Sequence, residues 1–290
     1  MSASRILVTG GAGQLGWAIR RVFADADVVA PPRAELDLAD GAAVARLVAA
    51  TKPQAIINCA AFNDVDGAES APLAALESNA FAVRSLALAA EAAGAVLVHY
   101  STDFVFDGRA SVPYDESVPP SPRSTYAASK LLGEWFALEA PGAFVLRVES
   151  LFGSPSGWTG RRGTMDAIVA GLRDGRDVRV FTDRVVTPTY SPDAAAATRH
   201  LLEAGAAPGL YHCVNTGTGT WHDVAVEAAR LLGVTPRLVP LTMDQVQMKA
   251  ARPRYCALSS QKLADAGFTM PPWTDALRRW LTPGRSPAAT

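Results

Sequence analysis

Short apolar runs alternate with alanine-rich stretches along the first half of the chain. The apolar runs predict strands at residues 6–9, 28–29, 56–59, 96–100 and 144–148, and the stretches between them predict helices at 15–24, 41–51, 72–93 and 126–139. Strands separated by helices favour parallel pairing through right-handed crossovers. The pattern therefore predicts an α/β fold, a doubly wound parallel sheet covered by helices on both faces.

The character of the chain changes after residue 153. Residues 154–163 are rich in glycine, serine and arginine, which favours a loop, and shorter predicted helices and strands follow. We therefore expect a nucleotide-binding domain at residues 1–153 and a smaller C-terminal region at 154–290 that mainly binds substrate. Elements at about 185–215 are expected to return to the first domain.

Composition excludes some classes of function. The formal net charge of the 290 residues is −1, so charge gives no reason to expect nucleic acid or an anionic membrane as a partner. Cys59, Cys213 and Cys256 form no CxxC pair, and the histidines form no ligand motif, so we expect reduced thiols and no metal. No apolar run looks long enough to span a bilayer, and we expect a cytoplasmic protein.

Glycines follow the first predicted strand directly. Two registers fit the stretch at residues 9–16: Gly10-x-x-Gly13-x-x-Gly16 and Gly11-x-Gly13-x-x-Gly16. Between a strand and a helix, such glycines permit a tight turn and let backbone N–H groups approach a pyrophosphate at the helix N-terminus. The first domain is therefore expected to be a Rossmann unit that binds a dinucleotide.

The residues after the second strand bear on the choice of dinucleotide. NAD-preferring units usually carry an acidic residue here, about 20 residues beyond the glycines. In this chain Arg33 follows the strand, and its guanidinium is suited to a 2′-phosphate, unless it is only a solvated surface arginine. Glu35 and Asp37 lie close enough to reach a ribose or adenine. We expect NADPH, with NADH as the alternative.

Tyr126 and Lys130 are four residues apart on a predicted helix, so they share one face. A positive charge beside a phenol lowers its pKa from about 10 and brings it nearer to the range in which a general acid works well. The spacing alone also arises on ordinary exposed helix faces.

Two longer blocks carry a family resemblance. Residues 101–108 read Ser-Thr-Asp-Phe-Val-Phe-Asp-Gly, and residues 126–134 read Tyr-x-x-x-Lys-Leu-x-Gly-Glu. With the glycine loop and the Arg252-Pro253 pair, they make the chain resemble the extended short-chain dehydrogenase/reductases, and within them the dTDP-4-dehydrorhamnose reductase family. The resemblance extends over nearly the whole chain.

The resemblance implies roles for individual residues. Tyr126 would protonate the substrate carbonyl oxygen, Lys130 would lower the pKa of Tyr126 and bind the nicotinamide ribose, and Thr102 would hydrogen-bond the same carbonyl oxygen. The implied cofactor-binding residues are Gly10, Gly13, Gln14, Leu15 and Gly16 at the pyrophosphate, Asp37 and Leu38 near the adenine, and Ala60, Ala61 and Phe62 along the cofactor.

The expected substrate-binding residues include a departure from the family. They are Asp103, Phe104, Glu149, Ser150 and Arg252. Where related reductases typically read Thr-Ser-Trp, this chain reads Val148-Glu149-Ser150, so the aromatic residue that packs on the sugar is replaced. Phe104 also stands where the family often has tyrosine. Because sites that bind a particular hydroxyl discriminate strongly, the sugar is left open.

The resemblance leads to one main expectation and two alternatives. The main one is NADPH-dependent reduction of the C4 keto group of a nucleotide-linked 4-keto-6-deoxysugar, with dTDP as the expected nucleotide. The first alternative is a nucleotide-sugar epimerase or dehydratase that keeps a bound NAD. The second is a non-catalytic regulatory subunit that resembles the methionine adenosyltransferase beta subunit. A homodimer is compatible with each of them.

Overall fold

A computed structural model of the chain describes residues 4–155, 160 and 163–282, so most of the loop expected at 154–163 lies outside the described residues. Six parallel strands form the main sheet in the order β2-β1-β3-β4-β5-β8. Their bounds are Asp27–Val29, Arg5–Thr9, Ala55–Asn58, Val96–Thr102, Phe144–Val148 and Gly209–His212. The predicted doubly wound parallel sheet is confirmed.

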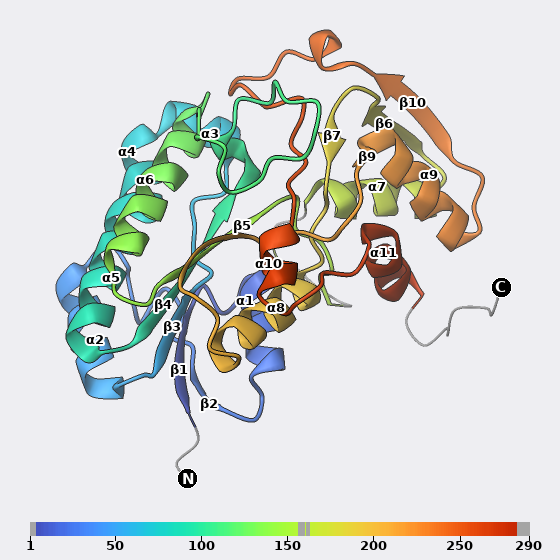
Figure 1. The fold of residues 1–290 in the computed structure, drawn as a ribbon. Helices are drawn as coiled ribbons and strands as arrows, with labels where there is room; N and C mark the ends of the chain where they lie inside the picture. The colour runs from blue at the N-terminus through green and yellow to red at the C-terminus, as the bar shows by residue number, and fades with distance from the viewer. Residues whose placement is uncertain (1–3, 156–159, 161–162, 283–290) are drawn as a thin grey trace.

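Helices cover both faces of this sheet (Figure 1). On one face α1 (Gln14–Val22) packs against α8 (Ser191–Glu203), and on the other lie α2 (Gly41–Thr51), α5 (Ala82–Ala93) and α6 (Thr125–Glu139). The alternation of side chains along β1 shows why both faces are apolar. Ile6 and Val8 join the core beside α1 and α8, whereas Leu7 joins the core beside α2 and α5.

The order of the strands creates a crevice at the carboxyl end of β1. The chain passes from β1 through α1 to β2 on one side, and then returns through α2 to β3 on the other side. Ligands of open α/β sheets bind at such a switch point. The glycine loop that follows β1 and residues 59–62 that follow β3 both lie there.

A second lobe has its own hydrophobic core, built around Trp221, Val224 and Leu277. Strands β6 (Asp177–Phe181) and β10 (Arg237–Leu241) pair in parallel, and β7 (Val185–Val186) pairs antiparallel with β9 (Gly219–Thr220). The helices of this lobe are α7 (Thr164–Arg173), α9 (Trp221–Leu232) and α11 (Trp273–Leu281), with a short 3-10 turn at Met243–Gln245. Helix α10 (Gln261–Asp265) instead packs against β8, and its Leu263 joins the core beside α1 and α8. Strand β8, in contrast, pairs with β5 of the first sheet, so both halves of the chain contribute to that sheet (Figure 1).

The helix predicted over residues 72–93 is continuous but not uniform. It consists of α4 (Pro72–Leu76), a π-helical segment (Glu77–Phe81) and α5, and α3 (Val65–Ser70) precedes it. By length and composition this stretch meets the criteria for a membrane span, so the expectation that no stretch does so is corrected. Half of its most apolar window is buried inside the protein, and the core helix of a soluble protein passes the same test.

Candidate active site

The glycine loop has a backbone that only glycine fits at two positions. Gly10 has φ +65°, and a Cβ atom there would lie 2.6 Å from the backbone nitrogen of Ala60. A Cβ atom on Gly16 would lie 2.3 Å from the carbonyl oxygen of Gly10. Gly13 is the N-cap of α1 and offers no side chain to its first turn. The helix N-terminus therefore keeps backbone N–H groups for an anion, which suits a dinucleotide pyrophosphate.

The side chains of Gln14 and Leu15, which lie between these glycines, contact other parts of the protein. The Gln14 Nε2 group donates a hydrogen bond of 2.9 Å to the hydroxyl of Ser191 at the start of α8. Leu15 is buried in the core between α1 and the sheet. These side chains fix the position of the loop, so only the backbone at these positions is left to face the expected pyrophosphate site.

The residues expected near the adenine lie in the turn after β2. Arg33 is exposed, and no ion pair holds it among the residues that the structure describes. The Asp37 carboxylate accepts a hydrogen bond from the Ala39 N–H at 3.1 Å, and Leu38 is half-buried against the core on the α2 side. The Arg33 guanidinium is therefore available to a phosphate at the edge of the crevice.

Two asparagines hold the wall that follows β3. Asn58 Oδ1 accepts hydrogen bonds from the Thr9 hydroxyl at 2.6 Å and from the Ala60 N–H at 3.1 Å. Asn79, in the π-helical segment, bonds to both backbone groups of Phe62, at 2.8 Å and 3.1 Å, and donates to the Ser129 hydroxyl at 3.0 Å. Sequence reasoning missed Asn79, because nothing in the local pattern shows that a helix bulge turns it inward.

Tyr126 and Lys130 lie in the first two turns of α6, and both are buried, with 8% and 3% exposed. The Ser124 hydroxyl caps the helix by accepting from the Ala127 N–H, and the Glu69 carboxylate accepts from the Thr125 N–H at 2.7 Å. Burial lowers the pKa of Lys130 to about 8. The N-terminus of the helix is thus fixed on both sides of the tyrosine.

Strand β4 brings the third expected catalytic residue next to this pair. The Lys130 Nζ donates to the backbone oxygen of Tyr100 at 2.6 Å, and Thr102 ends the same strand. The Thr102 hydroxyl donates to the Asp103 carboxylate at 3.0 Å and accepts from the Phe104 N–H at 3.2 Å. The Phe104 ring meets the Tyr126 ring edge-on, with 5.6 Å between centroids. Thr102, Tyr126 and Lys130 therefore belong to one buried region.

A buried ion pair joins α6 to the main sheet. Arg147 on β5 donates to both carboxylate oxygens of Glu134, at 2.8 Å and 2.7 Å, and both side chains are 2% exposed. The Ser101 hydroxyl donates to the same carboxylate at 2.5 Å. This bidentate pair links α6 to β4 and β5, the two strands that flank Tyr126 and Lys130.

The residues expected to bind substrate differ in burial, in backbone conformation and in whether their side chains already have partners. Asp103 and Glu149 are buried, with 2% and 1% exposed, and Ser150 has the unusual φ of +45°. Arg252 is already bound: its guanidinium makes bidentate hydrogen bonds of 2.8 Å and 2.7 Å to Asp66 on α3. Arg252 thus connects the two lobes beside the site.

A charged cluster that no motif indicated lies under Phe104. One carboxylate oxygen each of Asp103 and Glu149 and the sulfur of Cys256, all potential metal ligands, lie within 4.8 Å of one another. The Arg184 guanidinium donates to the Cys256 sulfur at 3.6 Å and lies 5.4 Å from the Phe104 ring centroid. Burial raises the pKa of Asp103 to about 6 and that of Glu149 to about 8. Because the Arg184 guanidinium already supplies a positive charge there, these carboxylates are better suited to share a proton than to bind a metal cation.

Comparison with known proteins agrees with this geometry. The model of the RmlD substrate binding domain family matches residues 4–285. The chain belongs to this family. The resemblance found from the motifs is therefore confirmed, and the family match extends through both lobes.

Individual relatives of this family cover almost the whole chain. A dTDP-4-dehydrorhamnose reductase of Streptomyces griseus is 38% identical over 95% of this chain and 90% of its own length. A probable dTDP-4,6-dihydroxy-2-methyloxan-3-one 4-ketoreductase of Streptomyces antibioticus is 37% identical over 94% of this chain and 93% of its own. A crystal structure of dTDP-4-dehydrorhamnose reductase from Bacillus anthracis in complex with NADP is 30% identical and has a TM-score of 0.89, covering 97% of this chain and 99% of that chain.

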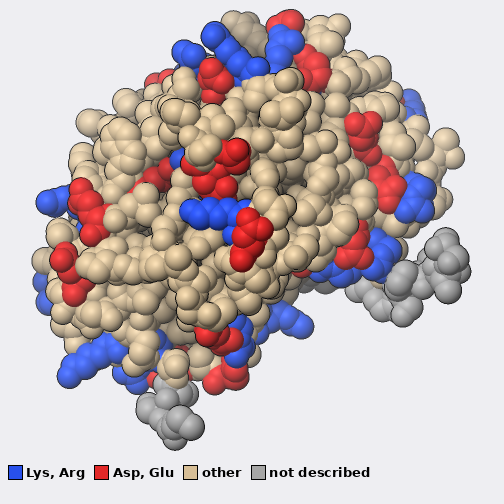
Figure 2. Space-filling model, in the orientation of Figure 1, with Lys and Arg blue, Asp and Glu red and all other residues tan. Residues whose placement is uncertain are grey.

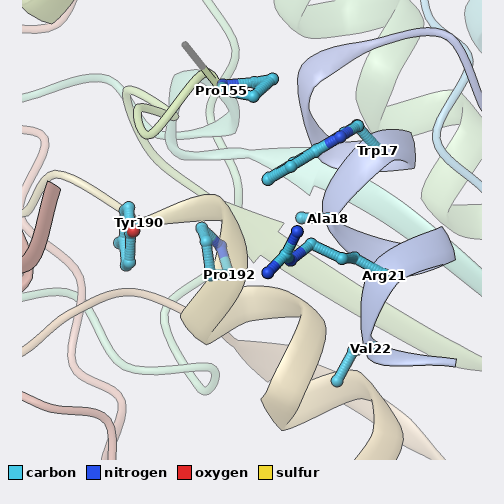
Figure 3. Close-up of a pocket in the computed structure, with 7 residues that line it drawn as sticks. All are labelled: Trp17, Ala18, Arg21, Val22, Pro155, Tyr190 and Pro192. Atoms are coloured by element: carbon cyan, nitrogen blue, oxygen red, sulfur yellow. The ribbon is translucent and has the colours of Figure 1, made fainter. Parts of the chain in front are cut away.

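A separate cavity of about 530 Å³ lies between α1 and the start of α8 (Figure 3). Figure 3 shows Trp17 and Arg21 reaching into it from α1, with Tyr190 and Pro192 across from them. None of the expected catalytic residues of this family member lines it. The cavity is therefore distinct from the region around Tyr126.

The surface charge agrees with the near-zero net charge. On the face drawn in Figure 2, acidic and basic side chains of the described residues are mixed, and neither sign forms a broad patch. This face of the described residues lacks the continuous basic stripe typical of nucleic-acid-binding proteins.

Proposed function

We propose that this protein is an NADPH-dependent reductase of the C4 keto group of a dTDP-linked 4-keto-6-deoxysugar. The observation that carries the proposal is the position of Tyr126 and Lys130 on the buried face of α6, beside Thr102 at the end of β4. The relatives named as dTDP-sugar 4-ketoreductases support the choice of substrate.

The residues around the switch point fit a nicotinamide dinucleotide. The backbone at Gly10, Gly13 and Gly16 would hold the pyrophosphate, and Arg33 would hold the 2′-phosphate. The walls formed by residues 36–38 and 60–62 would line the adenine and the path to the nicotinamide. When bound, the reduced nicotinamide supplies the hydride. We further propose that residues 1–153 mainly form this cofactor site, and residues 154–290 mainly the sugar site.

The side chains of the site supply a proton and orient the carbonyl group. Tyr126 donates its phenolic proton to the C4 oxygen as negative charge develops there. The Lys130 ammonium, held by the Tyr100 oxygen, stabilises the phenolate that remains. Thr102 is the second hydrogen-bond donor to the same oxygen. A charge-developing oxygen thus meets one acid and one orienting donor.

The test is cofactor oxidation with a panel of dTDP-, UDP- and GDP-linked 4-keto-6-deoxysugars. We expect NADPH consumption with a dTDP-linked substrate, and its loss in Tyr126→Phe, which keeps the ring against Phe104 and removes only the hydroxyl. Full activity in that variant would refute the acid role. Purification with bound NAD and no net cofactor consumption would indicate an epimerase or dehydratase. Absence of turnover with tight binding to an adenosyltransferase would indicate a regulatory subunit.

We also propose that the protein is a cytoplasmic homodimer. Its three cysteines are free, as expected in a reducing compartment. Large apolar side chains are exposed on α4, the π-helical segment, α5 and α6; they are Leu73, Phe81, Leu88, Trp135 and Leu138. Such a patch is typical of an interface. Light scattering should report a dimer that Trp135→Glu converts to a monomer, while Val112→Glu, at an exposed site elsewhere, has no effect. A wild-type monomer would refute the proposal.

A further inference from the structure

In the buried cluster beside Phe104, formed by Asp103, Glu149, Arg184 and Cys256, some polar atoms have no hydrogen-bond partner. Asp103 Oδ2, Glu149 Oε1 and Arg184 Nε have no hydrogen-bond partner, although all three side chains are at least nine-tenths buried. The other carboxylate oxygens are used. Glu149 Oε2 accepts from the N–H and the hydroxyl of Thr187, both at 2.6 Å. Unpaired buried polar atoms are costly, and one proton held by the two carboxylates lowers this cost at Asp103 Oδ2 and Glu149 Oε1.

Charge counting leads to the same conclusion. Two ionised carboxylates and one guanidinium would leave a net charge of −1 in a region closed to water, and Cys256 adds none, because burial raises the pKa of its thiol well above the usual range. Retaining one proton makes the cluster neutral. Burial raises the pKa values of both Asp103 and Glu149, and the charge of Asp103 raises that of Glu149 further. At neutral pH the pair therefore holds one proton.

The cluster is connected to the proposed reaction through Thr102. Its hydroxyl has one proton, and in the structure this proton goes to Asp103 Oδ1 at 3.0 Å. A hydroxyl that donates to an ionised Asp103 has no proton left for a substrate oxygen. When the proton is on Asp103 Oδ1 and Glu149 is ionised, the Asp103 O–H donates to Thr102 instead, and the proton no longer lies between the two carboxylates. Thr102 then accepts from Asp103 and from the Phe104 N–H, and its own proton is free.

We propose that the proton shared by Asp103 and Glu149 sets the direction of the Thr102 hydrogen bond, and so decides whether Thr102 donates to the carbonyl oxygen of the substrate. The two carboxylates are then positioning residues, and Arg184 supplies the charge that lets only one of them ionise without a penalty. This inference rests on the proposed reductase function. The charged and titratable groups that face Asp103 are Arg184, Glu149 and Cys256.

Two isosteric substitutions should lower kcat to different extents. In Glu149→Gln the cluster has no proton to share, and Asp103 stays ionised against Arg184. Thr102 then donates to Asp103 permanently, and we expect kcat to fall by about 10²-fold, as for the loss of one donor to a developing oxyanion. In Asp103→Asn the amide NH₂ can donate to Thr102 while the amide oxygen faces Arg184. We expect a clearly smaller loss of kcat than in Glu149→Gln.

A double variant separates this role from a structural one. Thr102→Val removes the donor directly and should lower kcat as much as Glu149→Gln does. The double variant should fall no further, because both changes remove the same hydrogen bond. Additive losses, or equal losses in Asp103→Asn and Glu149→Gln, would overturn the proposal. Glu139→Gln, on the exposed side of α6, is the matched control and should match the wild type.

Infrared spectroscopy tests the shared proton without any substrate. The folded wild-type protein at neutral pH should show the carbonyl stretch of a protonated carboxyl group, and both Asp103→Asn and Glu149→Gln should lose it. Absence of that band from the wild type would refute the inference. If the wild type reduces no 4-keto sugar but shows the band, the proposed function fails while the shared proton stands.

Discussion

The buried carboxyl group of Glu149 should make the stability of this protein fall as pH rises. Replacing it by glutamine removes the titration and keeps the shape. The new amide oxygen can accept the two hydrogen bonds from Thr187, and the NH₂ group can donate to the unpaired oxygen of Asp103. Glu149→Gln therefore changes one proton in the folded state and little else.

The size of the effect follows from the change in pKa on folding. Burial and the charge of Asp103 raise the pKa of Glu149 from its usual value near 4.5 to about 8. Between about pH 6 and about pH 8 the folded protein still holds much of a proton that the unfolded chain has lost. The free energy of unfolding therefore falls with rising pH, by at most about 1.4 kcal/mol per unit and by roughly 2 kcal/mol across this window, because half of the proton is lost by pH 8.

The measurement is urea unfolding of the wild type and Glu149→Gln at several pH values in this window. Burial lowers the pKa values of His99 and His212, but these groups titrate alike in both proteins and cancel in the difference. We expect the variant to gain about 2 kcal/mol relative to the wild type from the acid to the alkaline end. Parallel curves for the two proteins would refute the reasoning. The exposed-site variant Glu139→Gln should retain the wild-type slope.

Three further predictions concern the scaffold and the cofactor. Glu134→Gln leaves the buried Arg147 guanidinium without its counter-charge and should lower the free energy of unfolding by about 3–5 kcal/mol in urea titrations; a loss below about 1 kcal/mol would show that the pair is dispensable. Arg33→Ala should lower kcat/KM for NADPH by about 10–100-fold and leave kcat/KM for NADH unchanged. Equal losses with both cofactors would show that Arg33 does not bind the 2′-phosphate. Asn79→Ala removes the hydrogen-bond partners of the Phe62 backbone and should lower the free energy of unfolding by about 1–3 kcal/mol in thermal unfolding. It should also weaken NADPH binding in fluorescence titrations. Unchanged binding would show that Asn79 does not shape the cofactor site.

Local signals account for the parts of the fold that the sequence predicts well. The helix predicted at 41–51 has the bounds of α2, because Asp40 caps its first turn and Lys52 ends it in a left-handed conformation. The strand predicted at 144–148 has the bounds of β5, which is buried at every position. The glycine loop and the Tyr126/Lys130 pair were also visible, because each lies within a few residues of sequence.

Features that depend on contacts between distant segments were missed. Strand β10 contains Pro240 and is largely exposed at the edge of a two-stranded sheet, so its pattern does not resemble a buried strand. The cluster of Asp103, Glu149 and Arg184 is assembled from three separate connections, and no spacing indicates it. The sequence also could not show that Asp66 binds the Arg252 guanidinium; the expected role of Arg252 in substrate binding stays a prediction.

The hydrogen bonds of Asn79 and Glu69 and the ion pair between Asp66 and Arg252 differ in how they respond to salt. Asn79 ties the Phe62 wall to α6 through buried, neutral bonds, which ionic strength hardly affects. The Asp66–Arg252 pair joins the lobes through a carboxylate that is 46% exposed, where screening is effective. Concentrated salt should therefore weaken this one contact between the lobes while the wall against α6 stays rigid. Exchange of bound molecules would then be limited by a contact that ionic strength adjusts.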